Sequence, residues 1–203
     1  MMVVTLATTN QHKVLEVEPF LDGLDIEVVG RPLGCPAVAE TGDTFEENAI
    51  LKALAVARWT GGFALSDDSG LEVDALGGAP GVRSARFAGE HATDAMNRSH
   101  LLQLLSGQHG RAARFRCVLA LCDANGACVS FSGEVDGLIL DAEVGGGGFG
   151  YDPIFAPNEG GGRSFSEMTK EEKSRISHRG RALRQLREFL QREQWWRELT
   201  LPS

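Results

Sequence analysis

The sequence predicts an α/β fold, in a single domain over residues 1–203 with two lobes around a cleft. Short apolar runs typical of β-strands alternate with segments in which apolar residues recur at helical spacing. Two longer strand candidates, 114–121 and 129–140, flank an Asn-Gly turn and should form a β-hairpin. Strands and helices in this alternation are typical of a sheet covered by helices.

The chain begins with a predicted strand, a tight turn and a helix. The apolar run 3–7 is followed by Asn10, a good helix N-cap, and then by a helical period as far as Gly23. A second strand is expected at 26–29. This order places the start of a helix directly after the end of a strand.

A second helix and two short strands follow. Thr44, with Glu47 three places on, forms a capping box that should start a helix ending before a Gly-Gly pair. Residues 63–65 and 71–73 have strand composition, with the polar stretch 66–70 between them.

The second half contains two glycine-rich segments and three further helix starts. Residues 77–81 and 145–150 are too rich in Gly and Pro for regular structure. Thr93, Thr169 and Ser177 should each cap a helix, and we expect the helix after Ser177 to be the last.

The composition is that of an ordinary globular protein. With 42% hydrophobic and 24% charged residues, it excludes disordered and fibrous classes. No stretch reaches the roughly 18 apolar residues of a membrane span, and the N-terminus lacks a secretory signal. We therefore expect a cytoplasmic protein without membrane contact. Four cysteines without C-x-x-C or zinc spacing are expected to be thiols in a reducing compartment: Cys35, Cys117, Cys122 and Cys128.

The charge is unevenly distributed. The net charge is −8, but residues 163–198 hold eight Arg and two Lys against six Glu, or +4, which leaves −12 for the remainder. An acidic body repels phosphates, so a nucleic acid polymer is excluded as a partner. A single phosphate ligand remains compatible if a metal and a few cations converge on it.

The first candidate site is the strand-to-helix turn at residues 8–13. Free N–H groups and the positive end of a helix dipole suit a phosphate there. Lys13 is unfavourable in a first helical turn unless an anion comes close to it. The alternative is a capped helix with a solvated Lys13.

The second candidate is the pair Asp67 and Asp68. Adjacent carboxylates repel each other unless a cation lies beside them, and oxygen ligands favour Mg²⁺. Successive side chains of an extended segment point in opposite directions, so only one of the two should face the ion. The alternative is a polar turn.

The other two candidates lie in the second half. Residues 145–150 contain G-x-G-x-x-G, but Pro153 argues against the helix that a dinucleotide fold needs, while Phe149 could stack on a base. The alternative is a flexible hairpin linker. His178 and Arg179 are cations in a first helical turn and again need an anionic partner. Their alternative is a solvated basic helix face.

Seven motifs occur in this order along the chain: Thr8-x-Asn10-x-x-Lys13, Glu40-Thr41-Gly42, Thr44-Phe45-x-Glu47-Asn48-Ala49, Asp67-Asp68-Ser69-Gly70-Leu71, Gly77-Gly78-Ala79-Pro80-Gly81, Phe149-Gly150-Tyr151-Asp152-Pro153 and Ser177-His178-Arg179. Together they resemble the inosine/xanthosine triphosphate pyrophosphatase family of the bacterial RdgB type, from residue 3 to about 190. Thr9 departs from the small Gly or Ser frequent in the family. Residues 194–203, with Trp195 and Trp196, extend past the usual end.

The resemblance implies a Mg²⁺-dependent pyrophosphohydrolase that converts non-canonical purine triphosphates (ITP, dITP, XTP) to monophosphate and pyrophosphate. It implies cleansing of the nucleotide pool, a homodimer, and a long bent mixed sheet flanked by helices, with two lobes around a central cleft. It does not rank the three substrates, and the tail could either cover an apolar surface or join an interface.

The resemblance also implies roles for individual residues. Glu40 and Asp68 would hold Mg²⁺, Asp68 would be the general base acting through a metal-oriented water, and Glu47 would assist them. Lys13 would cradle the triphosphate, and Lys173 would add charge as pyrophosphate departs. Phe149 would stack on the purine, while Asp152, His178 and Arg179 would read its edge. The implied substrate-binding residues are Thr8, Thr9, Asn10, Gln11, His12, Lys13, Ser69, Phe149, Gly150, Tyr151, Asp152, Lys173, His178 and Arg179.

Two other functions remain open. A Maf-like nucleotide pyrophosphatase would share the architecture with a different base choice, although the motifs around Phe149 and Arg179 argue against it. A non-catalytic nucleotide sensor should have lost Glu40 or Asp68, and both are present.

Overall fold

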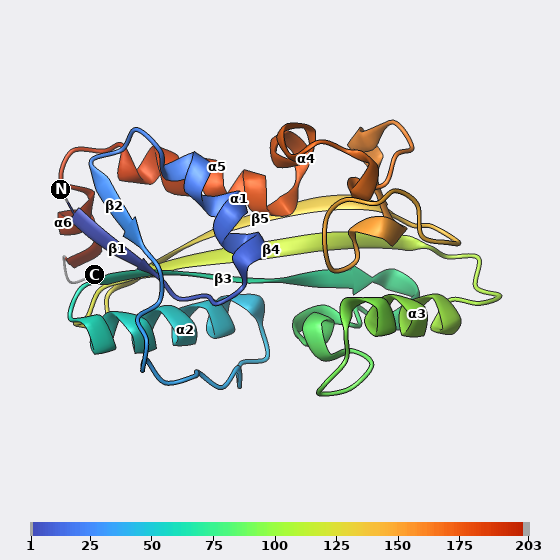
Figure 1. The fold of residues 1–203 in the computed structure, drawn as a ribbon, viewed down its shortest axis with the longest axis horizontal. Helices are drawn as coiled ribbons and strands as arrows, with labels where there is room; N and C mark the ends of the chain where they lie inside the picture. The colour runs from blue at the N-terminus through green and yellow to red at the C-terminus, as the bar shows by residue number, and fades with distance from the viewer. Residues whose placement is uncertain (1, 201–203) are drawn as a thin grey trace. The chain divides into compact units, whose positions relative to one another are not determined.

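The computed structural model describes residues 2–200 and consists of strands and helices in alternation (Figure 1). The strands and helices are β1 (Met2–Leu6), α1 (Gln11–Leu21), β2 (Ile26–Val29), α2 (Phe45–Thr60), β3 (Phe63–Val73), α3 (Asp94–Leu104), β4 (Ala112–Cys122), β5 (Cys128–Ile139), β6 (Phe155–Pro157), α4 (Lys170–Ile176), α5 (His178–Leu190) and α6 (Trp195–Thr200).

The strands form one six-stranded mixed sheet in the order β2-β1-β3-β4-β5-β6. Strand β1 pairs in parallel with both β2 and β3, and β5 pairs with β6 in antiparallel orientation. Gly137 permits the last pairing, because a Cβ there would lie 2.4 Å from the carbonyl oxygen of Ala156. The predicted α/β class, with a mixed sheet flanked by helices, is confirmed.

The described chain divides into two compact units, each discontinuous in sequence. Unit 1 contains residues 2–68, 117–132 and 182–200, and unit 2 contains residues 69–116 and 133–181.

Unit 1 has apolar packing on both faces of its strands. Val4 and Leu6 of β1 belong to a buried cluster with Val17 of α1 and Leu186 of α5. Residues of α2 belong to a separate cluster with Ala64 of β3. In Figure 1 α1 and α5 accordingly cover one face of these strands, and α2 covers the other. The first helix after β1 is thereby held with its N-terminus at the end of a buried strand.

Unit 2 has its own core, rich in aromatic rings. Phe115 of β4 packs edge-on against Phe155, with ring centroids 4.7 Å apart, and Phe165 packs against both. Leu101 and Leu105, at the end of α3, are fully buried in the same cluster.

Residues 66–70 are not a polar turn between two strands. They form the middle of the continuous strand β3, and Asp67 and Asp68 are both buried. The predicted break was wrong because both carboxylates have cationic partners from elsewhere in the fold, described below. Ser66 is accommodated in the same way, since its hydroxyl donates to the carbonyl of Ala49 in α2.

The chain does not end with the helix after Ser177, because α6 follows it. Trp195 in α6 is buried against Phe63 and Phe189, with ring centroids 5.1 and 6.0 Å away. Trp196 is 37% exposed. The predicted extension at 194–203 therefore covers an apolar surface of unit 1 through Trp195; its last three positions lie outside the described residues.

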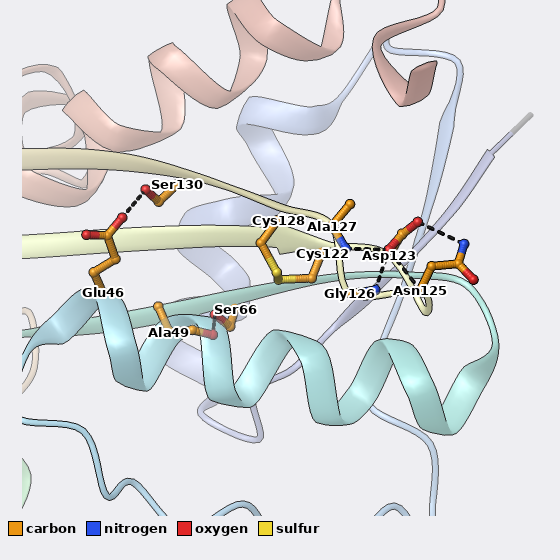
Figure 2. The surroundings of a disulfide bond; sticks show 10 residues. All are labelled: Glu46, Ala49, Ser66, Cys122, Asp123, Asn125, Gly126, Ala127, Cys128 and Ser130. Atoms are coloured by element: carbon orange, nitrogen blue, oxygen red, sulfur yellow. Dashed lines mark hydrogen bonds between the residues drawn. A yellow bond between two sulfur atoms is a disulfide. The ribbon is translucent and has the colours of Figure 1, made fainter. Parts of the chain in front are cut away.

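Two of the four cysteines are not thiols. Cys122, at the end of β4, and Cys128, at the start of β5, form a disulfide across the predicted hairpin (Figure 2). Asp123 organises the turn between them by accepting hydrogen bonds from the N–H groups of residues 125, 126 and 127. The expectation failed because cross-strand proximity, rather than C-x-x-C spacing, brings the two sulfurs together. Cys35 and Cys117 are thiols, as expected.

Within residues 2–200, no helix has the length and apolarity that crossing a membrane would require.

Candidate functional site

The phosphate candidate at the start of α1 is a capped helix whose lysine is paired. Asn10 caps α1, because its Oδ1 accepts from the N–H groups of His12 and Lys13 at 3.0 and 3.4 Å. Thr8 Oγ1 in turn accepts from the Asn10 N–H at 3.1 Å. The Lys13 ammonium lies 2.5 Å from Asp67 Oδ1. The capped helix was one alternative, but Lys13 is not solvated, because a carboxylate supplies the negative charge it needs.

A second lysine joins the two predicted metal ligands. Lys52 of α2 places its Nζ 2.8 Å from Glu40 Oε1 and 2.6 Å from Asp68 Oδ1. Lys52 also donates to the main-chain carbonyl of Asp67 at 3.0 Å, and Lys13 donates to the same oxygen at 3.2 Å. Two ammonium groups and three carboxylates are therefore concentrated around the middle of β3.

Asp67 and Asp68 point away from each other, as the alternation of an extended strand predicts. Asp67 Oδ2 accepts from the thiol of Cys117, while Asp68 faces Lys52. The candidate metal ligands are therefore Asp68 and Glu40, whereas Asp67 forms an ion pair with Lys13.

Burial and charge oppose each other at this cluster. Burial raises the pKa of the Asp68 carboxyl, and the attraction of Lys52 only partly offsets it. Burial works to lower the pKa of Lys52, but the attraction of Asp68 and then of Glu40 outweighs it, so that pKa is raised above its ordinary value. Lys52 therefore remains an ammonium ion, and Asp68 has more affinity for a proton than a solvated carboxylate.

The loop that carries Glu40 is attached to α2. Asn48, 1% exposed, accepts from the Gly42 N–H at 2.8 Å and donates to the Gly42 carbonyl at 3.2 Å. A Cβ on Gly42 would lie 2.6 Å from the Cβ of Glu47, so only glycine fits. Glu47 accepts from the N–H groups of residues 43 and 44 in the capping box. The structure thus gives Glu47 a structural role at the helix start.

The residues present fit Mg²⁺. Glu40 and Asp68 already direct one oxygen each at a single cationic atom, the Nζ of Lys52. Among the described residues, no group of three or more His, Cys, Asp or Glu side chains could hold a metal. Mg²⁺ is commonly bound by one or two carboxylates, with waters and substrate phosphates in its other positions. The pair suits such an ion rather than one that needs a complete protein cage.

In unit 2, Asp152 connects three of the predicted residues. Its Oδ2 lies 2.7 Å from the Lys173 ammonium and accepts from the Phe149 N–H at 2.9 Å. The Lys173 ammonium also lies over the Phe149 ring, 4.8 Å from its centroid. Asp152 and Lys173 are both buried, 3% and 7% exposed. Their ion pair fixes the peptide that carries the aromatic ring.

His178 and Arg179 are buried as well, so a solvated basic face is wrong for them. The Arg179 guanidinium donates to Ser69 Oγ at 2.8 Å and lies 5.7 Å from the Phe149 ring centroid. The His178 ring stacks on Phe115 at 4.6 Å. Gly180 makes this junction possible, because a Cβ there would lie 1.8 Å from the Ser174 carbonyl oxygen.

The glycine-rich loop is hydrogen-bonded to its surroundings and is not a free linker. Gly147 donates to the Ser166 carbonyl at 3.1 Å and accepts from the Ser166 hydroxyl. The predicted absence of a helix after the loop is confirmed, since a short 3₁₀ turn begins at Asp152. Tyr151 is buried and its hydroxyl donates to the Ser84 carbonyl at 2.8 Å. Burial raises the pKa of the Tyr151 phenol, and the Asp94 carboxylate adds to this.

The predicted residues thus form two groups, one in each unit. Thr8, Asn10, Lys13, Glu40 and Asp68 belong to unit 1, where Thr9, Gln11 and His12 are exposed at the start of α1. The group in unit 2 comprises Ser69, Phe149, Gly150, Tyr151, Asp152, Lys173, His178 and Arg179.

Comparison with known proteins places the chain in a family. The model of the family described as Ham1 matches residues 4–189. The chain belongs to the Ham1 family. This Ham1-family chain is 50% identical over 195 residues to the dITP/XTP pyrophosphatase of Desulforamulus reducens, covering 94% of this chain and 96% of the relative. It is 48% identical to the dITP/XTP pyrophosphatase of Geobacter sulfurreducens, covering 91% of this chain and 94% of that one.

Solved structures agree with this assignment. A HAM1 protein from Coxiella burnetii superposes with a TM-score of 0.88 at 42% identity, covering 94% of this chain and 98% of the other. The Ham1 protein of Staphylococcus aureus gives a TM-score of 0.86 at 40% identity, covering 95% and 100%. The predicted family and fold class are confirmed.

Sequence reasoning about this Ham1-family chain missed Lys52 and the role of Asn48. Both lie on the same helical stripe as the buried residues Phe45, Ala49 and Ala53. A polar side chain on an apolar stripe needs a buried partner, and that signal could have identified them. It could not have identified the partners, which come from other elements.

Proposed function

We propose that this Ham1-family protein hydrolyses non-canonical purine nucleoside triphosphates, ITP, dITP and XTP, to the monophosphate and pyrophosphate, and so cleanses the nucleotide pool. The observation that carries the proposal is the convergence of Glu40 and Asp68 on one cation beside Lys13. The substrate class is supported by the names of the similar proteins, which are dITP/XTP pyrophosphatases.

On the phosphate side, the work divides between cations and carboxylates. Lys13, with Thr8, Asn10 and the exposed start of α1, binds the triphosphate, since this helix end favours negative charge. Glu40 and Asp68 would hold Mg²⁺, which would neutralise phosphate charge and orient the attacking water. Asp68 accepts the proton of the attacking water, a role supported by its burial and by its place beside Glu40 in the charged cluster.

On the base side, Phe149 stacks on the purine while Asp152, His178 and Arg179 read its edge. Hypoxanthine and xanthine present a 6-keto oxygen, whereas adenine presents an amine that leaves buried donors unpaired. An unpaired buried polar group costs about 1–3 kcal/mol, or roughly tenfold to a hundredfold in discrimination. Guanine shares the 6-keto group, so its rejection depends on the 2-amino side.

We assign Lys173 to the base side as well. The resemblance implies that it adds charge as pyrophosphate departs. Its ammonium, however, lies 2.7 Å from Asp152 and over the Phe149 ring. This pairing supports a role in holding Asp152 and the stacking ring.

The test is pyrophosphate release with Mg²⁺ from ITP, XTP, dITP, GTP, ATP and UTP. We expect release from the first three and at least tenfold lower kcat/KM with GTP and ATP. Binding of ITP without turnover would indicate a nucleotide sensor instead. Preference for UTP would indicate a Maf-like activity. Either result would overturn the proposal.

We further propose a cytoplasmic homodimer. A nucleotide-pool enzyme needs access to cytoplasmic triphosphates, which supports the location. Cell fractionation tests the location, and analytical ultracentrifugation at micromolar concentration should give twice the chain mass of 21.8 kDa. A monomer mass under these conditions would contradict the dimer.

A further inference from the structure

Helix α3 holds the peptide groups on both sides of Gly150, the residue after the stacking ring. The Gly150 N–H donates to Asp94 Oδ2 at 2.8 Å. The Gly150 carbonyl accepts from Arg98 Nη1, also at 2.8 Å. Asp94 and Arg98 are four residues apart, so they lie on the same face of α3.

Arg98 also connects the two ends of the glycine-rich loop. Its Nε and Nη2 donate to the two carboxylate oxygens of Glu143 at 2.9 and 3.1 Å. Glu143 precedes the loop and Gly150 ends it, so one guanidinium holds both ends. The Arg98 side chain is only 13% exposed. The Glu143 side chain is 45% exposed, so the defined geometry of the pair comes from its two parallel hydrogen bonds rather than from burial of both partners. We call Asp94, Arg98 and Glu143 the α3 clamp.

The loop needs such a clamp because its backbone is intrinsically permissive. Gly145, Gly148 and Gly150 all have positive φ, and glycine loses more conformational freedom on ordering than any other residue. Phe149 lies between two of these glycines. A stacking ring that is already ordered binds its ligand better, because less freedom is lost on binding.

We propose that Asp94 and Arg98 are positioning residues that hold the Gly150 peptides and thereby fix the Phe149 ring for base stacking. Neither side chain belongs to the group that reads the base. Both act on Phe149 through the main chain. The expected effect on KM rests on the proposed function, whereas the expected effect on the order of the Phe149 ring does not. The two effects can therefore be tested separately.

The structural consequence is tested without any nucleotide. When 4-fluorophenylalanine replaces Phe149 and no other residue is changed, the protein should give a single narrow ¹⁹F resonance. Asp94→Ala and Arg98→Ala should broaden or split it, because each removes a hydrogen bond on one side of Gly150. Arg163→Ala is the matched control, since it breaks an ion pair of 3.0 Å with Glu172 in the same unit. An unchanged resonance in both clamp variants would overturn the proposal.

The enzymatic consequence separates KM from kcat. Asp94→Ala and Arg98→Ala should raise KM for ITP about tenfold and leave kcat within about twofold, because the lost interaction serves binding rather than the reacting phosphate. Asp94→Asn should restore the parental KM, since its amide oxygen still accepts the Gly150 N–H although the charge is gone. Arg163→Ala should leave both constants unchanged.

The outcomes are distinguishable. If the parent releases no pyrophosphate from any nucleotide, the proposed function fails, and the ¹⁹F comparison still decides the clamp. If the parent is active and Asp94→Ala has a parental KM, the clamp fails while the function stands. If Asp94→Asn is as impaired as Asp94→Ala, charge rather than the hydrogen bond matters, and the clamp is also overturned.

Discussion

Asp68 has two functions in the charged cluster of unit 1, as the partner of Lys52 and as the candidate base. Asp68→Asn keeps the side-chain shape and one acceptor oxygen but removes the charge and the proton acceptor. We expect kcat for pyrophosphate release from ITP to fall by at least about 100-fold, with the fold retained by circular dichroism. Asp43→Asn, at an exposed carboxylate before α2, is the control. Full activity of Asp68→Asn would remove Asp68 from the chemistry.

Lys52 tests whether Glu40 and Asp68 form the metal site. Lys52→Met leaves two neighbouring carboxylates without their cation, at 27% and 9% side-chain exposure. We expect the free energy of unfolding to fall by about 3 kcal/mol. Mg²⁺ should then raise the melting temperature of this variant more than that of the parent, because the metal replaces the lost ammonium.

The control for this experiment is Lys170→Met, at an exposed lysine in the first turn of α4. Its melting temperature should respond to Mg²⁺ as the parent does. Equal Mg²⁺ responses of Lys52→Met and the parent would show that the metal binds elsewhere.

For single residues, the sequence predicted which side chains need a charged partner, but not which residues supply it. Lys13 at a helix start required a negative charge, and the structure supplies Asp67, 54 positions away. Lys52 gave a weaker signal because lysine is common on helix surfaces. Partners so distant along the chain are set by tertiary packing, which local patterns do not contain.

The junction of α4 and α5 is the element that positions His178 and Arg179. A Cβ at Gly180 would overlap the Ser174 carbonyl oxygen, so Gly180→Ala must push the two helices apart. We expect a loss of about 1–3 kcal/mol in the free energy of unfolding and a raised KM for ITP, because Arg179 moves with the helix. Gly110→Ala, outside the glycine-rich loop in the same unit, is the control, since a Cβ there would meet only the Cβ of Ala75, at 3.9 Å. Parental stability and KM would show that the junction tolerates a side chain.

Capped helices were the elements that the sequence predicted best. Thr44, Thr93 and Thr169 cap α2, α3 and α4 as expected, because a cap is a contact within one turn of chain. Strand β3 was predicted as two pieces, since its buried carboxylates look like a turn when their cations are unknown. Helix α6 was missed. Its Trp195 packs against Phe63 of β3 and Phe189 of α5, and neither contact lies within α6 itself.

The division into two units is a property of the whole molecule, and its boundaries do not coincide with linker segments in the sequence. The chain passes between units 1 and 2 within β3, β4, β5 and α5, at residues 68/69, 116/117, 132/133 and 181/182. Composition shifts mark boundaries that fall in linkers, and these boundaries fall inside strands and a helix. Whether the chain is a single domain, as predicted, therefore depends on whether the two units unfold cooperatively.

Because these elements run from one unit into the other, we expect the two units to unfold together. Melting of unit 2 would free one half of β3, β4 and β5 and weaken the half that remains in unit 1. The three tryptophans, Trp59, Trp195 and Trp196, all lie in unit 1, so tryptophan fluorescence reports on that unit alone. Leu101→Ala should destabilise the core of unit 2, where Leu101 is fully buried, by about 3 kcal/mol.

The urea midpoint of tryptophan fluorescence should therefore fall for Leu101→Ala by as much as this loss of about 3 kcal/mol requires. It should fall similarly for Leu119→Ala, the matched change in the core of unit 1. A midpoint that responds to Leu119→Ala but not to Leu101→Ala would mean that the units unfold independently. In that case the chain would behave as two domains despite the strands they share.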